Sequence, residues 1–396
     1  MSERDRTDER SPDDHGGSTT LRVAMVCNGY RPHIGGVETH VGHLADALAR
    51  LGVRVEVLTQ ETDRAMAAYE DDGLVIVRRF HSVVSSQRDA QAPGLWAWIR
   101  RHAVDHDLVH FHSYHALVSA SALVARAPVV FTPHYHGTGH SPLRAAAHRV
   151  YRSVGRRVFA RAGAVICVSA AEAAVVERDF FAEAAGKIQV IPNGVDVNEV
   201  RKAEPISAAV PYFLTLGRLE RYKRVDRVID AMTLVPEPAQ LVIVGSGPML
   251  SDLVDLATSR GLAHRVLFMR DLSRPAVLRW LAGAQAVVSM SEHEAFGLTL
   301  AEGLAAGRRV VASDLPAHRE VARFGSPEAL RLVPASADRV QLAGALTDCL
   351  GTVRDLDRGA YVPSWDDIGA RTLTVYRGLK AVRDFGEVSR LSTRIA

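Results

Sequence analysis

The chain has 396 residues, enough for two or three domains, and its apolar content of 47% is that of a packed globular protein. Its 48 Lys and Arg residues are almost balanced by 45 Asp and Glu residues, and the net charge of +3 excludes a global attraction to nucleic acid. Any site for an anion must therefore be local.

We expect a cytoplasmic protein. The first twenty residues are polar and of mixed charge, which predicts a disordered tail over residues 1–20 rather than a signal peptide. No stretch reaches the ~18 apolar residues that span a bilayer. Cys27, Cys167 and Cys349 lie far apart in apolar segments, as is typical of core residues in a reducing compartment.

The first predicted strand covers residues 22–27, and residues 37–51 after it repeat apolar side chains at helical spacing. Between them lie Gly35 and Gly36, which can turn tightly and expose backbone N–H groups to a phosphate. An ordinary strand-to-helix turn is the alternative. The absence of a GxGxxG motif argues against a dinucleotide fingerprint.

The first half continues as apolar strands separated by helix-length segments. The next predicted strands are 53–58, 74–77, 108–111, 129–132, 164–168 and 188–191. This alternation predicts a mainly parallel sheet with helices on both faces, whose ligands lie beyond the carboxyl ends of strands.

Histidines follow two of these strands. His134 lies beyond the strand 129–132 with glycines nearby, which favours a functional role over that of an ordinary loop histidine. His110, His112 and His115 have no acidic or cysteine partner beside them, so packing or surface positions are favoured over a metal site.

A helix with one basic and one apolar face is predicted over residues 141–162. Its arginines, from Arg144 to Arg161, stand opposite apolar side chains at helical spacing. We expect a solvated face of a helix that packs on the core. Contact with a membrane surface or with an acidic acceptor is the minority alternative.

The second half begins after a linker at residues 202–211, where the apolar periodicity is lost. Its predicted strands are 212–216, 240–244, 266–269, 286–290, 309–313 and 330–333. Arg218 and Lys223 follow the first of them, and two such cations suit a phosphate. A structural ion pair is the alternative.

The most specific stretch covers residues 291–307, where a strand gives way to a helix. Gly297 at this turn lets a ligand approach the main chain, and the helix start presents N–H groups to phosphate or hydroxyl oxygens. Glu294 and Glu302 flank the turn. For Glu302 alone, a capping box that begins at Thr299 is an equally weighted alternative.

These two glutamates around Phe296-Gly297-Leu298 resemble the donor-sugar signature of retaining glycosyltransferases of family 4. The resemblance covers residues 21–382 and implies an α/β GT-B fold, in which two doubly wound, Rossmann-like domains face each other across a cleft and a C-terminal helix crosses back to the N-terminal domain. The expected domains are an acceptor-side domain over 21–204, a nucleotide-sugar-binding domain over 205–365, and the crossover helix with its tail over 366–396.

The resemblance also implies roles for single residues. Glu294 would bind hydroxyls of the transferred sugar, and Glu302 the nucleotide ribose. Arg218 and Lys223 would bind the donor diphosphate, and His134 would donate a hydrogen bond in the reaction centre. The expected donor-binding set is Gly36, Arg218, Lys223, Glu294, Phe296, Gly297, Leu298, Thr299 and Glu302. Arg224 stands where the family often has glycine, a departure that concerns the shape of the loop.

The expected function is transfer of a sugar, with retained anomeric configuration, from a nucleoside-diphosphate sugar to a hydroxyl group of a saccharide, lipid or small molecule. No metal or other cofactor is expected, and no nucleic-acid partner. A nucleotide-sugar 2-epimerase of the same fold is one alternative, and a non-catalytic sugar-nucleotide-binding protein is another. The sequence leaves the base, the sugar and the acceptor open.

Overall fold

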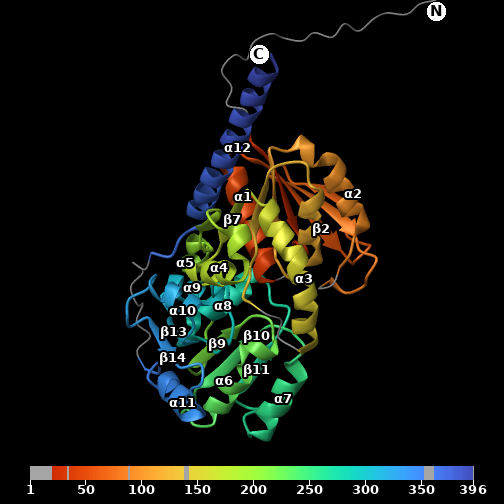
Figure 1. The fold of residues 1–396 in the computed structure, drawn as a ribbon. Coiled ribbons are helices and arrows are strands. Elements are labelled where there is room, and N and C mark those ends of the chain that lie inside the picture. Colours follow the sequence, from red (N-terminus) through yellow and green to blue (C-terminus); the bar gives the residue numbers. More distant parts are fainter. Residues whose placement is uncertain (1–19, 34, 88–89, 138–141, 352–360, 396) are drawn as a thin grey trace, which may run out of the picture.

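The computed structural model describes residues 20–33, 35–87, 90–137, 142–351 and 361–395, with only the helical backbone for 142–150 and 385–395. Two α/β units are stacked one above the other, each built on its own sheet (Figure 1). The predicted GT-B arrangement, with a C-terminal helix that crosses back to the first unit, is confirmed.

The first sheet has eight strands in the order β3-β4-β2-β1-β5-β6-β7-β8, and only the pairing of β3 with β4 is antiparallel. Its strands are β1 (Arg22–Cys27), β2 (Arg54–Glu61), β3 (Tyr69–Asp71), β4 (Val75–His81), β5 (Leu108–His112), β6 (Val129–Thr132), β7 (Ala164–Cys167) and β8 (Ile188–Val190). The helices around it are α1 (Gly36–Arg50), α2 (Pro93–His102), α3 (Pro142–Arg161) and α4 (Ala170–Ala184), with 3-10 turns at Ala103–Asp105 and Leu117–Val124.

The second sheet has six parallel strands in the order β11-β10-β9-β12-β13-β14. They are β9 (Tyr212–Leu216), β10 (Gln240–Val244), β11 (Val266–Met269), β12 (Ala286–Ser289), β13 (Arg309–Ser313) and β14 (Leu330–Val333). The helices around it are α5 (Val197–Lys202), α6 (Val225–Met232), α7 (Leu250–Ser259), α8 (Arg274–Gly283), α9 (Leu298–Ala305), α10 (Pro316–Ala322) and α11 (Arg339–Thr347).

The central strands of both sheets are almost continuous apolar runs, because helices cover both of their faces. In the first sheet β1 lies between β2 and β5, and the connections to these two neighbours run in opposite directions. In the second sheet β9 lies between β10 and β12 in the same way. Ligands of such sheets bind at these switch points.

Helix α12 (Trp365–Ile395) runs back along α1 of the first unit (Figure 1). Arg50 at the end of α1 pairs with Asp366 at 2.7 Å, and Lys380 pairs with Asp107 at 2.5 Å. Gly369 lies so close to α1 that a β-carbon at this position would stand 2.9 Å from the β-carbon of Ala47. Glycine therefore permits the close approach of the two helices.

A second set of contacts joins the two units at the start of α4. The hydroxyl of Ser169 donates to the carbonyl oxygen of Ala295 at 2.6 Å. The backbone N–H groups of Ala170 and Ala171 donate to the carboxylate of Glu320 in α10, at 2.8 and 2.6 Å. A carboxylate is favourable at a helix start because the N–H groups there lack partners within the helix.

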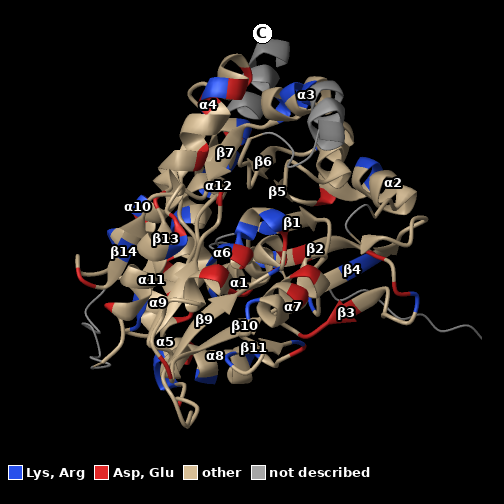
Figure 2. Ribbon diagram, turned by 90° about the horizontal axis from the view of Figure 1, so that it is seen from below, with Lys and Arg blue, Asp and Glu red and all other residues tan. Residues whose placement is uncertain are grey.

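Charged residues of both signs are interspersed along the ribbons of the two units in the view of Figure 2. On α3, Arg152 donates to the carbonyl oxygen of Asp179 at 2.8 Å, and Arg161 donates to those of Ala125 and Ala127. These arginines stabilise the first unit itself, while the side chains of Arg144 and Arg149 lie outside the described residues. Among the described helices, none has the length and apolar character needed to cross a bilayer.

All three cysteines are buried, as predicted for core residues. Burial raises the pKa of Cys27 to about 12.

We predict that Gly369→Ala and Gly378→Ala have opposite effects on stability, although both lie in α12. The added methyl group of Gly369→Ala meets Ala47, and overpacking of this kind costs about 1–3 kcal/mol. A β-carbon at Gly378 meets nothing within 4 Å, so Gly378→Ala should gain up to about 1 kcal/mol from helix propensity. Thermal unfolding followed by circular dichroism measures both, and an equal rise of the midpoint in the two variants would contradict the docking of α12.

Candidate active site

The turn between β12 and α9 has the geometry that the sequence predicted. Gly297 is the residue that precedes the helix, and its φ of +106° lies in the left-handed region that favours glycine. Leu300 and Ala301 donate to the carbonyl oxygen of Gly297 at 3.0 and 3.2 Å. The N–H groups of Leu298 and Thr299 therefore come before the first hydrogen bond of the helix, where an anion or a hydroxyl group can accept them.

Glu302 does not form the capping box that the sequence left open. The residue that caps α9 is Gly297, without a side-chain hydrogen bond, so Thr299 already lies inside the helix. The carboxylate of Glu302 is buried and pairs instead with Arg274 at 2.7 Å. Arg274 is the first residue of α8 and also reaches Glu199 at 3.3 Å. The sequence analysis missed Arg274 because nothing near it in the chain marks it.

Glu294 forms an ion pair with Lys223 and accepts a hydrogen bond from the hydroxyl of Ser291 at 3.0 Å. Burial would raise the pKa of Glu294, but the positive charge of Lys223 outweighs it and holds the pKa below its ordinary value. Burial likewise opposes the charge of Lys223, and Glu294 raises the pKa of that ammonium above its ordinary value. Both groups are therefore charged at neutral pH, and two predicted donor-binding residues are in contact.

Arg218 lies at the start of the same loop, just after β9. Its side chain is 54% exposed, and its nitrogen lies 3.6 Å from the carboxylate of Glu220. A small pocket at the switch point between β9 and β12 is lined by Gly217, Arg218, Lys223 and Ser289 among others. The two predicted cations thus line one pocket, and the more exposed of them is Arg218.

Arg224, which stands where the family often has glycine, adopts a left-handed conformation with φ +49° and ψ 40°. This conformation explains why glycine suits the position. The side chain of Arg224 pairs with Asp226 at 3.0 Å and with Glu292 at 2.6 Å, and these pairs hold the loop.

Phe296 is buried in the core of the second unit, while Leu298 and Thr299 are half-buried. A role for Phe296 in binding would therefore have to come from its main chain.

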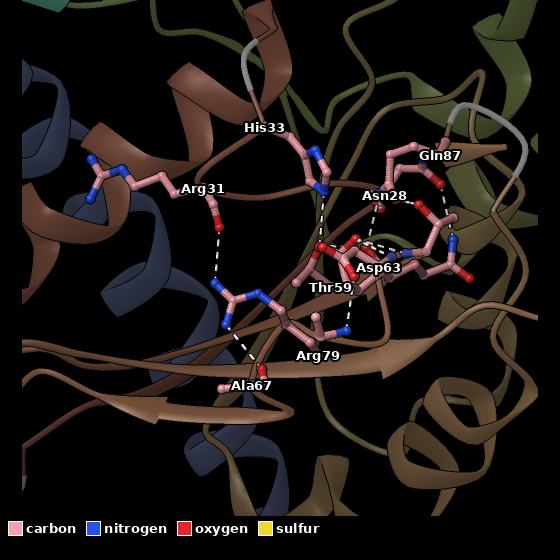
Figure 3. A network of polar contacts seen from close by, with 12 residues as sticks. Asn28, Arg31, His33, Thr59, Asp63, Ala67, Arg79 and Gln87 are labelled. Atoms are coloured by element: carbon pink, nitrogen blue, oxygen red, sulfur yellow. Dashed lines mark hydrogen bonds and ion pairs between the residues drawn. The ribbon is translucent and has the colours of Figure 1, made fainter. Parts of the chain in front are cut away.

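Gly36 is the first residue of α1, and the space where its β-carbon would lie is open. The loop before it is held by polar contacts that Figure 3 shows: Arg79 donates to the carbonyl oxygen of Arg31 at 2.9 Å, and His33 bonds to Glu61 at 2.9 Å. Glu38 in the first turn of α1 has a pKa raised by burial and is attracted by Arg218 of the second unit. The loop at Gly36 therefore faces the second unit.

His134 follows β6 and adopts a left-handed conformation with φ +47°. Its ring lies against those of His40 and His112, with centroids 4.8 and 5.8 Å away. Burial lowers the pKa of His134 well below its ordinary value, so the imidazole is neutral and can donate one N–H bond.

His110 is a packing residue, as predicted: its Nδ1 bonds to the Tyr376 hydroxyl at 2.6 Å and its Nε2 to the Thr132 hydroxyl at 2.8 Å. His112 is also buried, whereas His115 is exposed.

His318 in α10 is a second residue that the sequence analysis did not mark. Its Nδ1–H donates to the carbonyl oxygen of Ser313 at 2.7 Å, which leaves Nε2 as an acceptor. This Nε2 is buried and has no hydrogen-bond partner among the described residues. The ring lies against Gly297, and burial lowers its pKa while Glu294 opposes the shift. A neutral acceptor therefore stands beside the donor turn.

Comparison with known proteins identifies the family of the chain. Residues 34–199 match the family model described as Glycosyltransferase Family 4, and residues 196–348 match that of Glycosyl transferases group 1. The phosphatidyl-myo-inositol mannosyltransferase of Mycobacterium leprae is 31% identical over 90% of this chain and 96% of its own length. The D-inositol 3-phosphate glycosyltransferase of Xylanimonas cellulosilytica is 27% identical over 86% of this chain and 91% of its own.

Solved structures share the fold at low identity. Sucrose-phosphate synthase from Thermosynechococcus elongatus superposes with a TM-score of 0.70 at 21% identity and covers 95% of this chain and 100% of its own. HepE of Anabaena, in complex with UDP-glucose, does so with a TM-score of 0.65 at 20% identity, over 92% of this chain and 99% of its own. The chain therefore belongs to glycosyltransferase family 4 and is a glycosyltransferase of the GT-B fold.

Proposed function

We propose that this glycosyltransferase moves a sugar from a nucleoside-diphosphate sugar to a hydroxyl acceptor, with retained anomeric configuration and without a metal. The observation that carries the proposal is the pocket at the end of β9, which Arg218 and Lys223 line and beside which Lys223 pairs with the ionised Glu294. Such an arrangement offers cations to a diphosphate and a hydrogen-bond acceptor to a sugar in one place.

Negative charge builds up on the diphosphate as it leaves. Arg218, Lys223 and the amides of Leu298 and Thr299 would oppose that charge, and one such donor is typically worth about 3 kcal/mol of barrier, a factor of ~10². This set of donors supports a reaction in which no metal is needed to stabilise the leaving group. The exposed Arg218 would make the first contact, since Lys223 is already held by Glu294.

Glu294 would orient the transferred sugar rather than attack it. Its carboxylate already accepts from Lys223 and Ser291, and an ionised carboxylate can accept further bonds from sugar hydroxyls. Glu302 is held by Arg274 and would meet the ribose. With both carboxylates committed, the two-carboxylate mechanism of glycosidases does not fit, and a front-face reaction in which the leaving phosphate takes the acceptor proton is favoured.

The acceptor would enter from the side of the first unit, near Gly36 and His134. The names of two relatives contain an inositol phosphate, one within a lipid and one as a free phosphate. We therefore propose polyol phosphates, and inositol phosphates first among them, as the acceptors to test.

We predict that Glu294→Gln and Arg218→Ala each lower sugar transfer at least tenfold while the fold survives, because each removes a group that contacts the donor. The matched control is Glu292→Gln, which lies two residues before Glu294 on the exposed side of the loop and pairs with Arg224. Its turnover should stay close to that of the wild type. Wild-type turnover in Glu294→Gln, measured by release of nucleoside diphosphate, would refute the assignment.

Arg274→Ala should raise the KM for the donor, because Glu302 loses the partner that orients it, and Arg274→Lys should restore part of the loss. Effects of such orienting partners are typically 10- to 100-fold at metal sites, and we expect about tenfold here. Arg279→Ala is the control, since Arg279 is exposed on the same helix. An unchanged donor KM with a lower melting temperature would show that Arg274 is only structural.

Incubation with the donor alone tests the epimerase alternative. The donor is found by thermal-shift screening of nucleoside diphosphates and their sugars, since a ligand at 100 times its Kd stabilises by about 2.7 kcal/mol. We expect no change of the sugar without an acceptor, and full transfer in the presence of a chelator once an acceptor is added. A C2 epimer released from the donor alone would contradict transfer as the function.

A further inference from the structure

Three histidines from separate elements of the first unit converge on one point. His40 comes from α1, His112 is the last residue of β5, and His134 follows β6. Because β1, β5 and β6 are neighbours in the sheet, their carboxyl ends meet beside the start of α1. Each residue offers a ring nitrogen, and the three nitrogens lie within 4.8 Å of one another.

These nitrogens lack the partners that buried polar groups normally have. His40 and His112 are 2% and 0% exposed. Among the described residues, no hydrogen-bond partner reaches Nε2 of His40, either nitrogen of His112, or Nε2 of His134. Buried polar atoms without partners are rare in native proteins and indicate a missing water or ion.

The neighbouring His110 shows that the fold can satisfy a buried histidine here. Both of its nitrogens are hydrogen-bonded, to Tyr376 and to Thr132, although its ring lies 4.0 Å from that of His112. Crowding of the rings therefore does not by itself prevent a buried histidine from being hydrogen-bonded at this point of the fold.

The spacing of the rings fits a shared metal ion. Three imidazoles bound tetrahedrally to Zn²⁺, with Zn–N distances of about 2.0–2.1 Å, have ring centroids about 5 Å apart. The centroids of His40, His112 and His134 are 5.4, 4.8 and 5.8 Å apart. Binding would draw the three ligand nitrogens, which lie within 4.8 Å of one another, onto one ion.

A hydrogen bond to a residue outside the cluster orients His40 for binding a metal ion. Its Nδ1–H donates to Oδ1 of Asn193 at 2.7 Å, which leaves the lone pair on Nε2, the nitrogen that faces the cluster. Histidines that bind metals are oriented in this way by an acceptor on the other nitrogen.

We propose that His40, His112 and His134 form a binding site for a late first-row divalent metal ion, Zn²⁺ in the first place, with a fourth position open on the side of His134. Three imidazoles select such ions rather than Mg²⁺ or Ca²⁺, which prefer oxygen ligands. His134 is only half-buried and gives the ion its path of entry.

A metal ion bound at this site would inhibit sugar transfer. This consequence rests on the proposed function, in which the ring of His134 donates a hydrogen bond to the transferred sugar. A metal ion on His134 holds the ring in the cluster and withdraws it from the reaction, while the other donor-binding residues stay as they are. Metal-free transfer and metal inhibition are therefore compatible.

The test is a titration of the full chain, made without a histidine tag, with Co²⁺ and then with Zn²⁺. We expect one Co²⁺ per chain with the strong visible absorption of a four-coordinate ion, displaced by one Zn²⁺. His112→Gln and His40→Gln should abolish the absorption, and Asn193→Ala should weaken Zn²⁺ binding about 10- to 100-fold. His43→Gln is the matched control, because His43 lies one turn from His40 but stacks on Trp365, with centroids 5.3 Å apart.

Wild-type protein without the visible absorption, or with the same absorption in His112→Gln, would overturn the proposal. If both His→Gln variants unfold, two other measurements test the site: the number of Co²⁺ ions bound per wild-type chain, and the Zn²⁺ affinity of Asn193→Ala compared with that of His43→Gln. Equal Zn²⁺ affinity in those two variants counts against the site. In the assay of sugar transfer, Zn²⁺ should inhibit the wild type and spare His112→Gln. If the proposed function is wrong, only this inhibition experiment fails, because the measurement of metal binding requires no turnover.

Discussion

The ion pair between Lys223 and Glu294 is the interaction on which the candidate donor site depends. Lys223 ends the short turn after β9 and Glu294 lies in the turn after β12, so the pair ties together the two strands that flank the switch point. Each charge lies largely out of solvent and is stable because the other is present. The pair keeps the carboxylate ionised and leaves Arg218 as the more exposed cation of the pocket.

The first unit holds the donor turn from the other side. Ser169 donates to the carbonyl oxygen of Ala295, the residue next to Glu294, and the start of α4 binds the carboxylate of Glu320. The chain then returns through α12, which docks on the C-terminal half of α1 through Gly369 against Ala47 and Asp366 against Arg50. Contacts between the units therefore adjoin the loop that carries Glu294.

Two groups of histidines in the first unit differ in one physical respect. The nitrogens of His110 are both hydrogen-bonded, whereas Nε2 of His40, both nitrogens of His112 and Nε2 of His134 have no partner in the described part of the chain. A buried polar group without a partner costs about 1–3 kcal/mol, a loss of stability that a bound ion would offset. Such a loss is typical of sites where binding takes precedence over stability.

The sequence by itself determined the alternation of strands and helices, the two units, and the turn at Gly297. The spacing of apolar residues along the chain predicts the strands and helices, and the left-handed conformation of the turn requires a glycine. It missed β3, whose three residues are exposed and carry no apolar signal. Only the tertiary structure decided that Glu302 pairs with Arg274 rather than with its own helix start, that Lys223 pairs with Glu294, and that His40 joins His112 and His134. The physical reason is that these contacts join residues far apart in the chain, and the order of strands in a sheet, which no local pattern encodes, brings them together.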